Sequence, residues 1–315
     1  MVLGGGSWGS AFSCLLRDLG HEVTLACRDP EQVRVIAGTA HNPRYVTDLD
    51  LRGITPTTVG EAALDDAELI VLAVPSRAFA EVAASLPAKA RVLSLTKGLD
   101  PASGERLSTR VRGRAVAVLS GPNMAEEIAA GLPSAAVIAS ENRDFADELQ
   151  AAINSMVFRV YVNDDLVGVE LCAAAKNVIA LAAGGVDGLG LGDNAKASLI
   201  TRGLVEMARL GEACGAQPDT FSGLAGMGDL IVTCFSGFGR NRRAGEQIAR
   251  GRSADEAAAE IGQVVEGLTT APVLRDLSRR LGVELPITEG VCRVLGGEPI
   301  HALLASLMGR QPTQE

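Results

Sequence analysis

The stretch GGGSWG at residues 4–9 decides how the first half of this chain folds. It contains the pattern GxGxxG as Gly4, Gly6 and Gly9, directly after a short apolar run and at the start of a helical stretch at 8–19. In this setting the first glycine permits a tight turn, the second lets backbone N–H groups approach a pyrophosphate, and the third lets helix and strand pack closely. A chain with 36 glycines also produces this pattern by chance, so a purely structural turn is the alternative.

The rest of the first half fits that interpretation, because short β-like runs alternate with helical stretches. The run ELIVLAV at 68–74 is apolar without alternation, as in a parallel strand that is buried on both faces. Alternating strands and helices predict βαβ units and a mainly parallel sheet in a Rossmann-type α/β domain. The strands are predicted at 1–4, 22–27, 68–74, 91–95, 115–119, 135–139 and 158–162, with helices that begin near Pro30 and Pro75.

The pattern changes after Asp164 and Asp165, where long stretches rich in Ala, Leu and Gly follow at helical spacing. No convincing strand occurs among them, so this half is predicted to be all-α. We therefore divide the chain into a dinucleotide-binding domain at 1–163 and a helical substrate-binding and catalytic domain at 164–315. Helices are predicted at 166–183, 194–214, 241–250, 254–261, 269–281 and 288–295.

Composition argues against several classes of function. The 315 residues include 29 Lys and Arg against 38 Asp and Glu, a net charge of −9, and only 3% aromatic residues. An acidic chain with few aromatics is unsuited to nucleic acid, which requires basic surfaces and stacking side chains. Three distant histidines and six scattered cysteines predict reduced thiols and no metal site. The cysteines are Cys14, Cys27, Cys172, Cys214, Cys234 and Cys292.

No run reaches the ~18 uninterrupted apolar residues of a membrane span. The most apolar stretch, at 171–186, is interrupted by Lys176 and Asn177. The chain also begins without the basic and apolar segments of a secretory signal. We therefore expect a cytoplasmic protein without a membrane span.

Lys176 is the most informative single residue. On a helix its neighbours three and four positions away are Cys172, Ala173, Ile179 and Ala180, and none of them is a carboxylate. A lysine desolvated in an apolar segment has its pKa lowered toward neutrality and can exchange protons. The alternative is a lysine that reaches the surface or pairs with a distant acid for stability.

Arg28 and Asp29 follow the second predicted strand and bear on the choice of cofactor. An acidic side chain at this point binds the ribose 2′-OH of NAD, whereas an arginine suits the 2′-phosphate of NADP. Arg28 comes first and favours NADP, while Asp29 keeps NAD possible. A solvated surface charge is the alternative interpretation of Arg28.

Two further stretches are typical of small anion sites. Lys97 follows a predicted strand, which places it at the edge of the sheet where ligands of open α/β sheets bind. The run RNRR at 240–243 opens a helix after a loop rich in Gly and Ser. Guanidinium groups and free backbone N–H groups at such a point suit a phosphate monoester. For Arg242 and Arg243 a basic surface turn is an equal alternative.

Taken together, these residues resemble the NAD(P)-dependent sn-glycerol-3-phosphate dehydrogenases of the bacterial biosynthetic type. The resemblance covers nearly the whole chain and rests on many long motifs in one order. They are VLGGGSWG (2–9), NPRYV (42–46), LAVPS (72–76), SLTKGL (94–99), LSGPN (119–123), VGVELCAAAKNVIALAAG (167–184), DGLGLGDNAKASLITRGL (187–204), GLAGMGDLIVTC (223–234), RNRR (240–243), IGQVVEG (261–267) and LPITE (285–289).

The resemblance implies reduction of dihydroxyacetone phosphate to sn-glycerol 3-phosphate, a precursor of phospholipids. Carried over by motif position, the catalytic residues are Lys176, Asp229 and Lys97, with Lys176 as proton donor and acceptor. The implied cofactor residues are Gly4, Gly6, Ser7, Trp8, Gly9, Arg28, Tyr45, Lys97, Ala125, Arg240, Val264 and Glu266. The implied substrate residues are Lys97, Gly121, Asn123, Lys176, Asp229, Arg240 and Asn241. The partner is thus a small phosphate substrate, the cofactor is NADP with NAD possible, and the large apolar helical half suits a homodimer.

The chain departs from the family pattern at three points. The segment before the glycine motif is short, Asn123 stands where Ser or Thr is common, and Gly239 stands where Ser is common. Two other functions stay open. One is that of another two-domain NAD(P)-dependent hydroxyacid dehydrogenase, and the other is that of a non-catalytic dinucleotide-binding sensor.

Overall fold

The computed structural model describes residues 1–300 and contains one eight-stranded sheet. The strand order is β3-β2-β1-β4-β5-β6-β7-β8, and every neighbouring pair is parallel except β6 and β7. This confirms the mainly parallel sheet. The strands are β1 Val2–Leu3, β2 Val23–Cys27, β3 Ile54–Thr58, β4 Ile70–Leu72, β5 Arg91–Ser94, β6 Ala115–Ser120, β7 Ser134–Ala139 and β8 Phe158–Asn163.

Strand β4 shows why the sheet is buried on both sides. Ile70 and Leu72 belong to one apolar cluster and Val71, between them, belongs to another, as the alternation of side chains along a strand requires.

The helices of the strand-containing half pack on the sheet through buried aromatic side chains, such as Phe12 of α1 and Phe79 of α3. They are α1 Ser7–Asp18, α2 Pro30–Thr39, α3 Ser76–Ala84, α4 Ala125–Ala129 and α5 Arg143–Ile153, with 3-10 turns at η1 Val59–Glu61, η2 Leu64–Asp66 and η3 Leu107–Arg110.

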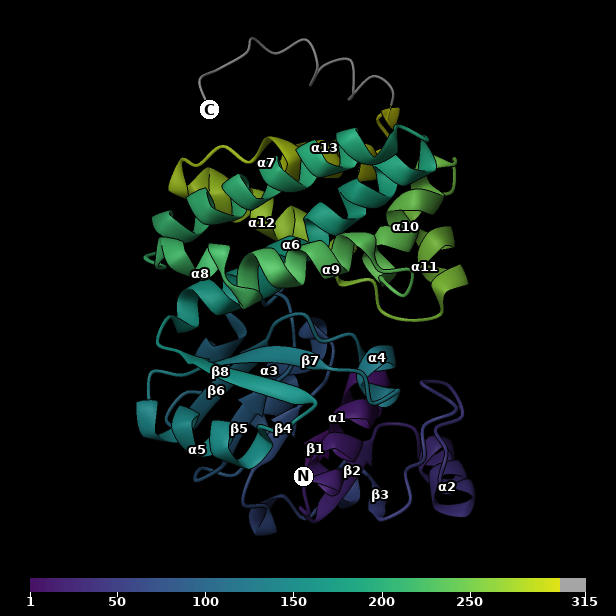
Figure 1. Cartoon of the computed structure of the whole chain (residues 1–315), viewed down its shortest axis with the longest axis vertical. Coiled ribbons are helices and arrows are strands. Elements are labelled where there is room, and N and C mark those ends of the chain that lie inside the picture. The colour runs from purple at the N-terminus through teal and green to yellow at the C-terminus, as the bar shows by residue number, and fades with distance from the viewer. Residues whose placement is uncertain (301–315) are drawn as a thin grey trace.

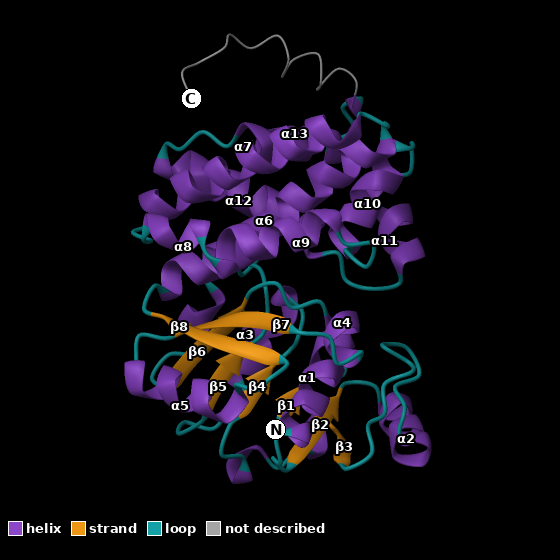
Figure 2. Ribbon diagram, viewed as in Figure 1, coloured by secondary structure: helices purple, strands orange, loops and turns teal. Residues whose placement is uncertain are grey.

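The second half is helical throughout its described part, and Figure 2 shows it as a separate layer of helices beside the sheet. The helices are α6 Leu166–Gly188, α7 Gly192–Ala213, α8 Pro218–Ser222, α9 Asp229–Phe235, α10 Arg240–Ala249, α11 Ala254–Ile261, α12 Glu266–Leu281 and α13 Pro286–Leu295, with a π-helical turn, η4, at Leu224–Gly228.

Helix α6 is the centre of this layer and contacts α7, α9, α10, α12 and α13 (Figure 1). Its approach to α10 is so close that a Cβ at Gly184 would lie 1.8 Å from the carbonyl oxygen of Arg242, which excludes every residue but glycine there. By length and mean hydropathy, 1.7 in its most apolar window, α6 could cross a membrane. However, 89% of that window is buried inside the protein, as in the core helix of a globular domain.

Most predicted elements occur, with ends shifted by a few residues, but three were missed. Strand β3 has the polar sequence ITPTT with Pro56 inside it, which an edge strand tolerates. Helices α8 and α9 are short, and no element was predicted at their positions. The last strand ends at Asn163 and α6 begins at Leu166. A domain boundary at 163 stays a prediction, and residues 301–315 of the predicted second domain lie outside the described residues.

Candidate active site

The glycine turn between β1 and α1 has two positions that only glycine can occupy and one that is open. Gly4 has a φ of +120°, and a Cβ there would lie 2.4 Å from the carbonyl oxygen of Ala73. A Cβ at Gly9 would lie 1.9 Å from the carbonyl oxygen of Gly4. At Gly6, by contrast, an added Cβ meets no atom within 4 Å. The turn therefore packs tightly on its protein side and leaves space above Gly6.

Two buried donors beside this turn have no partner within residues 1–300. They are the hydroxyl Oγ of Ser7 and the indole Nε1 of Trp8, whose ring packs edge-on against Phe12 with centroids 5.4 Å apart. Buried polar atoms are nearly always paired, so these two donors are available to a ligand or to ordered water. The first N–H groups of α1 are also free to bind an anion. These residues fit a bound dinucleotide.

The remaining predicted cofactor residues of the first half surround this turn. Tyr45 is half-buried, and its backbone N–H donates to Asn42, which also donates to the carbonyl oxygen of Gly5. Arg28 is exposed directly after β2. Ala125 is buried at the start of α4, the helix that packs against α1.

Three charged side chains from distant segments meet at the boundary between the sheet and the helical layer. Lys97 comes from the loop after β5, Lys176 from the middle of α6 and Asp229 from the start of α9. Lys97 Nζ donates to Asp229 Oδ2 at 2.9 Å, and Lys176 Nζ donates to Asp229 Oδ1. One carboxylate thus holds two ammonium groups, and the three side chains carry a net charge of +1.

Burial changes the pKa values of the charged side chains in this cluster. The Lys176 side chain is 5% exposed, and its desolvation lowers the pKa of Lys176 to about 7, an effect that Asp229 opposes and Lys97 reinforces. Burial alone would raise the pKa of Asp229, but the ammonium groups of Lys176 and Lys97 outweigh it and hold that pKa below its ordinary value. Lys176 therefore exchanges its proton near neutral pH while Asp229 stays ionised.

Residues from the end of β6 complete the polar contacts of Lys97. Its Nζ donates to Asn123 Oδ1 at 3.0 Å and to the carbonyl oxygen of Gly121 at 3.4 Å. The other half of the Asn123 amide, Nδ2, is buried and has no partner in the described part of the chain. Asn123 thus presents a spare donor beside the two lysines.

The start of α10 lies close to Lys176 because Asn241 bonds to the next residue of α6. Asn241 Nδ2 donates to Asn177 Oδ1 at 3.0 Å, and Asn241 Oδ1 accepts the N–H of Gly267 at 2.8 Å. Arg240, the first residue of α10, is exposed, and its side chain makes no hydrogen bond or ion pair within residues 1–300. The first N–H groups of this helix and the Arg240 guanidinium have the chemistry that binds an anion.

Arg242 belongs to a different contact. Its NH1 donates to Asp187 Oδ2 at 2.8 Å and to Glu246 Oε2 at 3.0 Å, and Lys196 also binds Asp187. Arg242 therefore ties α10 to α6, and through Asp187 and Lys196 to α7, so its guanidinium is already engaged by carboxylates. Within the basic turn at 240–243, the Arg240 side chain is therefore available to a ligand, whereas the Arg242 side chain is already paired with carboxylates.

Comparison with known protein families shows which family this chain belongs to. Residues 1–146 match the family described as NAD-dependent glycerol-3-phosphate dehydrogenase N-terminus, and residues 165–304 match its C-terminus. The chain belongs to the NAD-dependent glycerol-3-phosphate dehydrogenase family. This confirms the resemblance found in the sequence, and the chain is an NAD(P)-dependent enzyme.

Individual members of the glycerol-3-phosphate dehydrogenase family are similar over the full length. The chain is 45% identical to glycerol-3-phosphate dehydrogenase [NAD(P)+] of Moorella thermoacetica, with 100% of this chain and 96% of the relative covered. It is 46% identical to the enzyme of the same name from Parafrankia, with 100% and 98% covered.

Solved structures show the same fold. Glycerol-3-phosphate dehydrogenase from Coxiella burnetii superposes with a TM-score of 0.94 at 38% identity, with 98% of each chain covered. A ketopantoate reductase from Ralstonia eutropha superposes with a TM-score of 0.61 at 19% identity, with 98% of this chain and 100% of that chain covered, and shares the fold alone.

Several polar residues of the cluster were not identified from the sequence. Thr233 accepts from Lys176 Nζ at 3.0 Å and donates to the carbonyl oxygen of Asp229 at 2.6 Å, and Ser120 donates to Asp229 Oδ2 at 3.3 Å. The i, i+4 spacing of Asp229 and Thr233 places both on one face of a helix, but this was missed because no helix was predicted at α9. Asn177, next to Lys176, was noted only as an interruption of an apolar run.

Glu266 joins the two halves beside the cluster. Its carboxylate accepts the N–H of Ser76 at 3.1 Å and the Ser76 hydroxyl at 2.6 Å, at the first turn of α3. A Cβ at Gly98, next to Lys97, would lie 3.6 Å from Glu266 Oε2. Val264 is half-buried in the turn before α12, two residues before Glu266.

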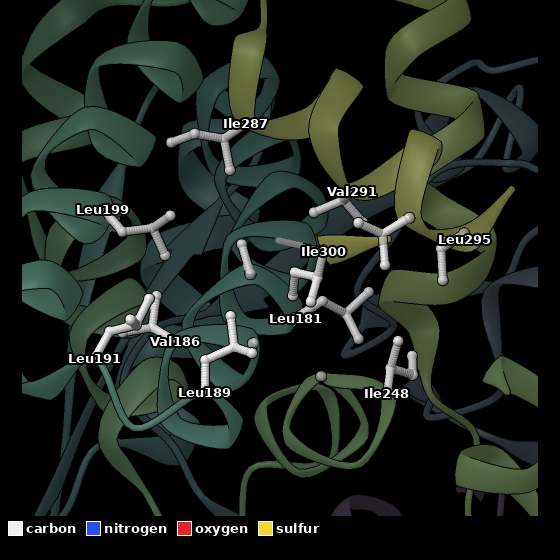
Figure 3. Close-up of a pocket in the computed structure, with 14 residues that line it drawn as sticks. Leu181, Val186, Leu189, Leu191, Leu199, Ile248, Ile287, Val291, Leu295 and Ile300 are labelled. Carbon is white, nitrogen blue, oxygen red and sulfur yellow. The ribbon is translucent and has the colours of Figure 1, made fainter. Parts of the chain in front are cut away.

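A second pocket, in the helical layer, has a different character. Its lining is apolar and comes mainly from α6, α7, α10 and α13, with Leu181, Ile248 and Val291 among its side chains (Figure 3). It contains no ionisable side chain and so carries no acid–base chemistry. Within residues 1–300, no three His, Cys, Asp or Glu side chains are placed to hold a metal ion.

Proposed function

We propose that this chain interconverts dihydroxyacetone phosphate and sn-glycerol 3-phosphate with NAD(P)H and so supplies glycerol phosphate for phospholipid synthesis. The observation that carries the proposal is the buried cluster of Lys176, Asp229 and Lys97. It combines a lysine that titrates near neutrality with an anion site at the start of α10. The relatives named as glycerol-3-phosphate dehydrogenases support the same reaction.

Lys176 is the proposed proton donor in the direction of ketone reduction. A dinucleotide held by the glycine turn, Ser7 and Trp8 would supply the hydride to the ketone carbon. Negative charge then develops on the ketone oxygen, and the Lys176 ammonium stabilises that charge and donates its proton. In the reverse direction the neutral amine of Lys176 accepts the hydroxyl proton. A pKa of about 7 suits both tasks, because both protonation states are present at neutral pH.

The surrounding residues position the substrate and the lysine. Asp229 holds both ammonium groups in place, and Lys97 keeps the pKa of Lys176 low through its charge. Arg240 and the free N–H groups of α10 bind the phosphate, and the free Nδ2 of Asn123 donates to a substrate oxygen. Binding energy from the phosphate then orients the reacting carbon.

The proposed cofactor site comprises the glycine turn, Ser7, Trp8 and Tyr45 in the first half, with Ala125 on α4. Arg240, Val264 and Glu266 approach it from the helical half. We expect NADP to be preferred and NAD to be accepted, because Arg28 is exposed and unpaired within the described residues at the end of β2.

The test is the oxidation of NADPH and of NADH, followed by absorbance, with dihydroxyacetone phosphate as substrate. Unphosphorylated dihydroxyacetone and a 2-oxo acid serve as controls. Fast oxidation with the phosphorylated ketone alone supports the proposal. Turnover of the 2-oxo acid would favour a hydroxyacid dehydrogenase, and dinucleotide binding without any turnover would favour a sensor.

The enzyme is further proposed to be a cytoplasmic homodimer. Several large apolar side chains of the helical half are exposed, among them Ile231 and Phe235, which lie one turn apart on α9. Such side chains suit a subunit interface. Light scattering after gel filtration measures the mass directly, and a mass of one chain at micromolar concentration would contradict the dimer.

A further inference from the structure

Asp29 occupies the position at which an acidic residue binds the ribose of NAD, but each of its carboxylate oxygens already has a partner. Oδ1 accepts the N–H of Glu31 at 3.0 Å and so caps the N-terminus of α2. Oδ2 forms an ion pair with Arg44 NH2 at 2.8 Å. Each oxygen can still accept one more hydrogen bond, but the negative charge of Asp29 is balanced by Arg44.

The backbone of Arg44 is fixed to the glycine turn by a buried asparagine. Asn42 is 1% exposed, and its Nδ2 donates to the carbonyl oxygen of Gly5 at 2.9 Å and to Ser10 Oγ at 3.0 Å. Its Oδ1 accepts the N–H groups of Arg44 at 3.1 Å and of Tyr45 at 3.2 Å. All four hydrogen-bonding positions of the amide are therefore occupied. The loop that carries Arg44 is thus held beside the turn that binds the pyrophosphate.

Arg28 and Arg44 are both neighbours of Asp29, one along the chain and the other through an ion pair. Arg28 precedes it in the chain and has no hydrogen bond or ion pair in the described part of the chain, whereas Arg44 contacts it through one nitrogen. The Arg44 guanidinium carries five N–H donors, so the bond to Asp29 leaves others free. Together the three side chains carry a net charge of +1 at the end of β2, the point at which Rossmann-type domains hold the adenine ribose.

We propose that Arg44 and Arg28 together bind the 2′-phosphate of NADP, and that Arg44 is a determinant of cofactor choice. This inference rests on the proposed function of the glycine turn as a dinucleotide site. A phosphate monoester carries a charge of about −1.5 to −2 and three acceptor oxygens, which two guanidinium groups match. The 2′-hydroxyl of NAD carries no charge and gains nothing from the two guanidinium charges, and its acidic partner, Asp29, already has its charge balanced by Arg44.

The test is the affinity of the purified chain for four probes, measured by calorimetry: NADPH, NADH, adenosine 2′,5′-bisphosphate and 5′-AMP. In Arg44→Gln the affinity for the two 2′-phosphorylated probes falls roughly 10- to 100-fold, the range for a lost charge-assisted hydrogen bond. The affinity for NADH and 5′-AMP is unchanged or rises, because Asp29 is released. Arg28→Gln shows the same selectivity.

Arg34→Gln is the matched control, because Arg34 lies on the exposed side of α2 and, among residues 1–300, pairs only with Glu31. It leaves all four affinities unchanged. Equal losses for NADPH and NADH in Arg44→Gln, or no loss of NADPH, would overturn the role of Arg44. Because these measurements need no substrate, a failure to reduce dihydroxyacetone phosphate with NADPH binding intact would refute the proposed reaction and leave this inference standing.

Discussion

At the scale of single residues, Lys176 combines the properties of a reversible proton donor. It is buried, it is held by a carboxylate, and a second ammonium group lies on the same carboxylate. Burial and the second charge both favour the neutral amine, while Asp229 favours the ammonium. The balance places the pKa of Lys176 at about 7, where catalysis in both directions is efficient.

Replacement of Lys176 by alanine is expected to lower kcat by ~10²- to 10⁴-fold, the contribution of a general acid. Steady-state kinetics with dihydroxyacetone phosphate measures this loss, and thermal unfolding checks that the variant folds. Lys89→Ala, at an exposed position, is the control and keeps full activity. Near-normal turnover of the Lys176 variant would assign the proton transfer to another group.

Asp229→Asn is expected to move the pH dependence in a defined direction. Asp229 raises the pKa of Lys176, so its removal lowers that pKa further below 7. The midpoint of ketone reduction then shifts to lower pH, since the ammonium is lost earlier as pH rises. Initial rates across pH measure the midpoint, and a shift to higher pH would contradict the described pairing.

The contrast between Lys176 and Asp229 shows what a sequence can predict at this scale. Lys176 is unusual by itself, because no acid lies within one helical turn of it. Its partner is 53 residues away, on a helix that was missed. The pair is therefore visible only once the fold brings α6 and α9 together, although the family motifs indicated both residues.

At the scale of elements, the glycine turn between β1 and α1 contains glycines that the fold requires and one glycine that leaves room for a ligand. The contacts of Gly4 and Gly9 are with protein atoms, and the space above Gly6 is open. The motif and its position after a strand predicted this turn correctly. Strand β3 was missed because its polar ITPTT sequence lies at the sheet edge, where burial does not impose an apolar pattern.

Two alanine substitutions in this turn are expected to differ. Gly6→Ala leaves the free energy of unfolding almost unchanged, because its Cβ meets nothing, but it weakens NADPH binding by filling the space for the pyrophosphate. Gly9→Ala destabilises the fold itself, since its Cβ would lie 1.9 Å from a backbone oxygen. Urea unfolding and NADPH titration distinguish the two, and full NADPH affinity in Gly6→Ala would place the dinucleotide elsewhere.

At the scale of the whole molecule, two carboxylates of the helical layer bind the strand-containing half. Glu266 binds Ser76, and Glu170 of α6 accepts from Ser108 N at 2.9 Å, Ser108 Oγ at 2.5 Å and Arg106 NH1 at 2.8 Å. Glu170 lies on the same helix as Lys176 and so fixes that helix against the sheet. These partners are 62 to 190 residues apart, beyond the reach of local sequence patterns.

Glu170→Ala is expected to lower the free energy of unfolding by about 3 kcal/mol, because it leaves Arg106 without its buried partner. The control is Glu148→Ala, which removes a largely exposed ion pair with Arg91 and costs about 0–1 kcal/mol. Urea unfolding measures both values. Equal effects of the two substitutions would mean that the Glu170 contact contributes little to the joint between the halves.

The measurement that tests the central claim most directly is the pH dependence of turnover in both directions. If Lys176 transfers the proton, ketone reduction falls as pH rises through about 7 and alcohol oxidation rises through the same pH. The substrate phosphate also titrates near about 6, but it changes both directions in the same sense. Opposite slopes by themselves follow from the proton that ketone reduction consumes, so the evidence is a break near pH 7 in each profile. We expect both breaks to disappear in Lys176→Ala, and breaks near pH 7 that persist in this variant would contradict the account.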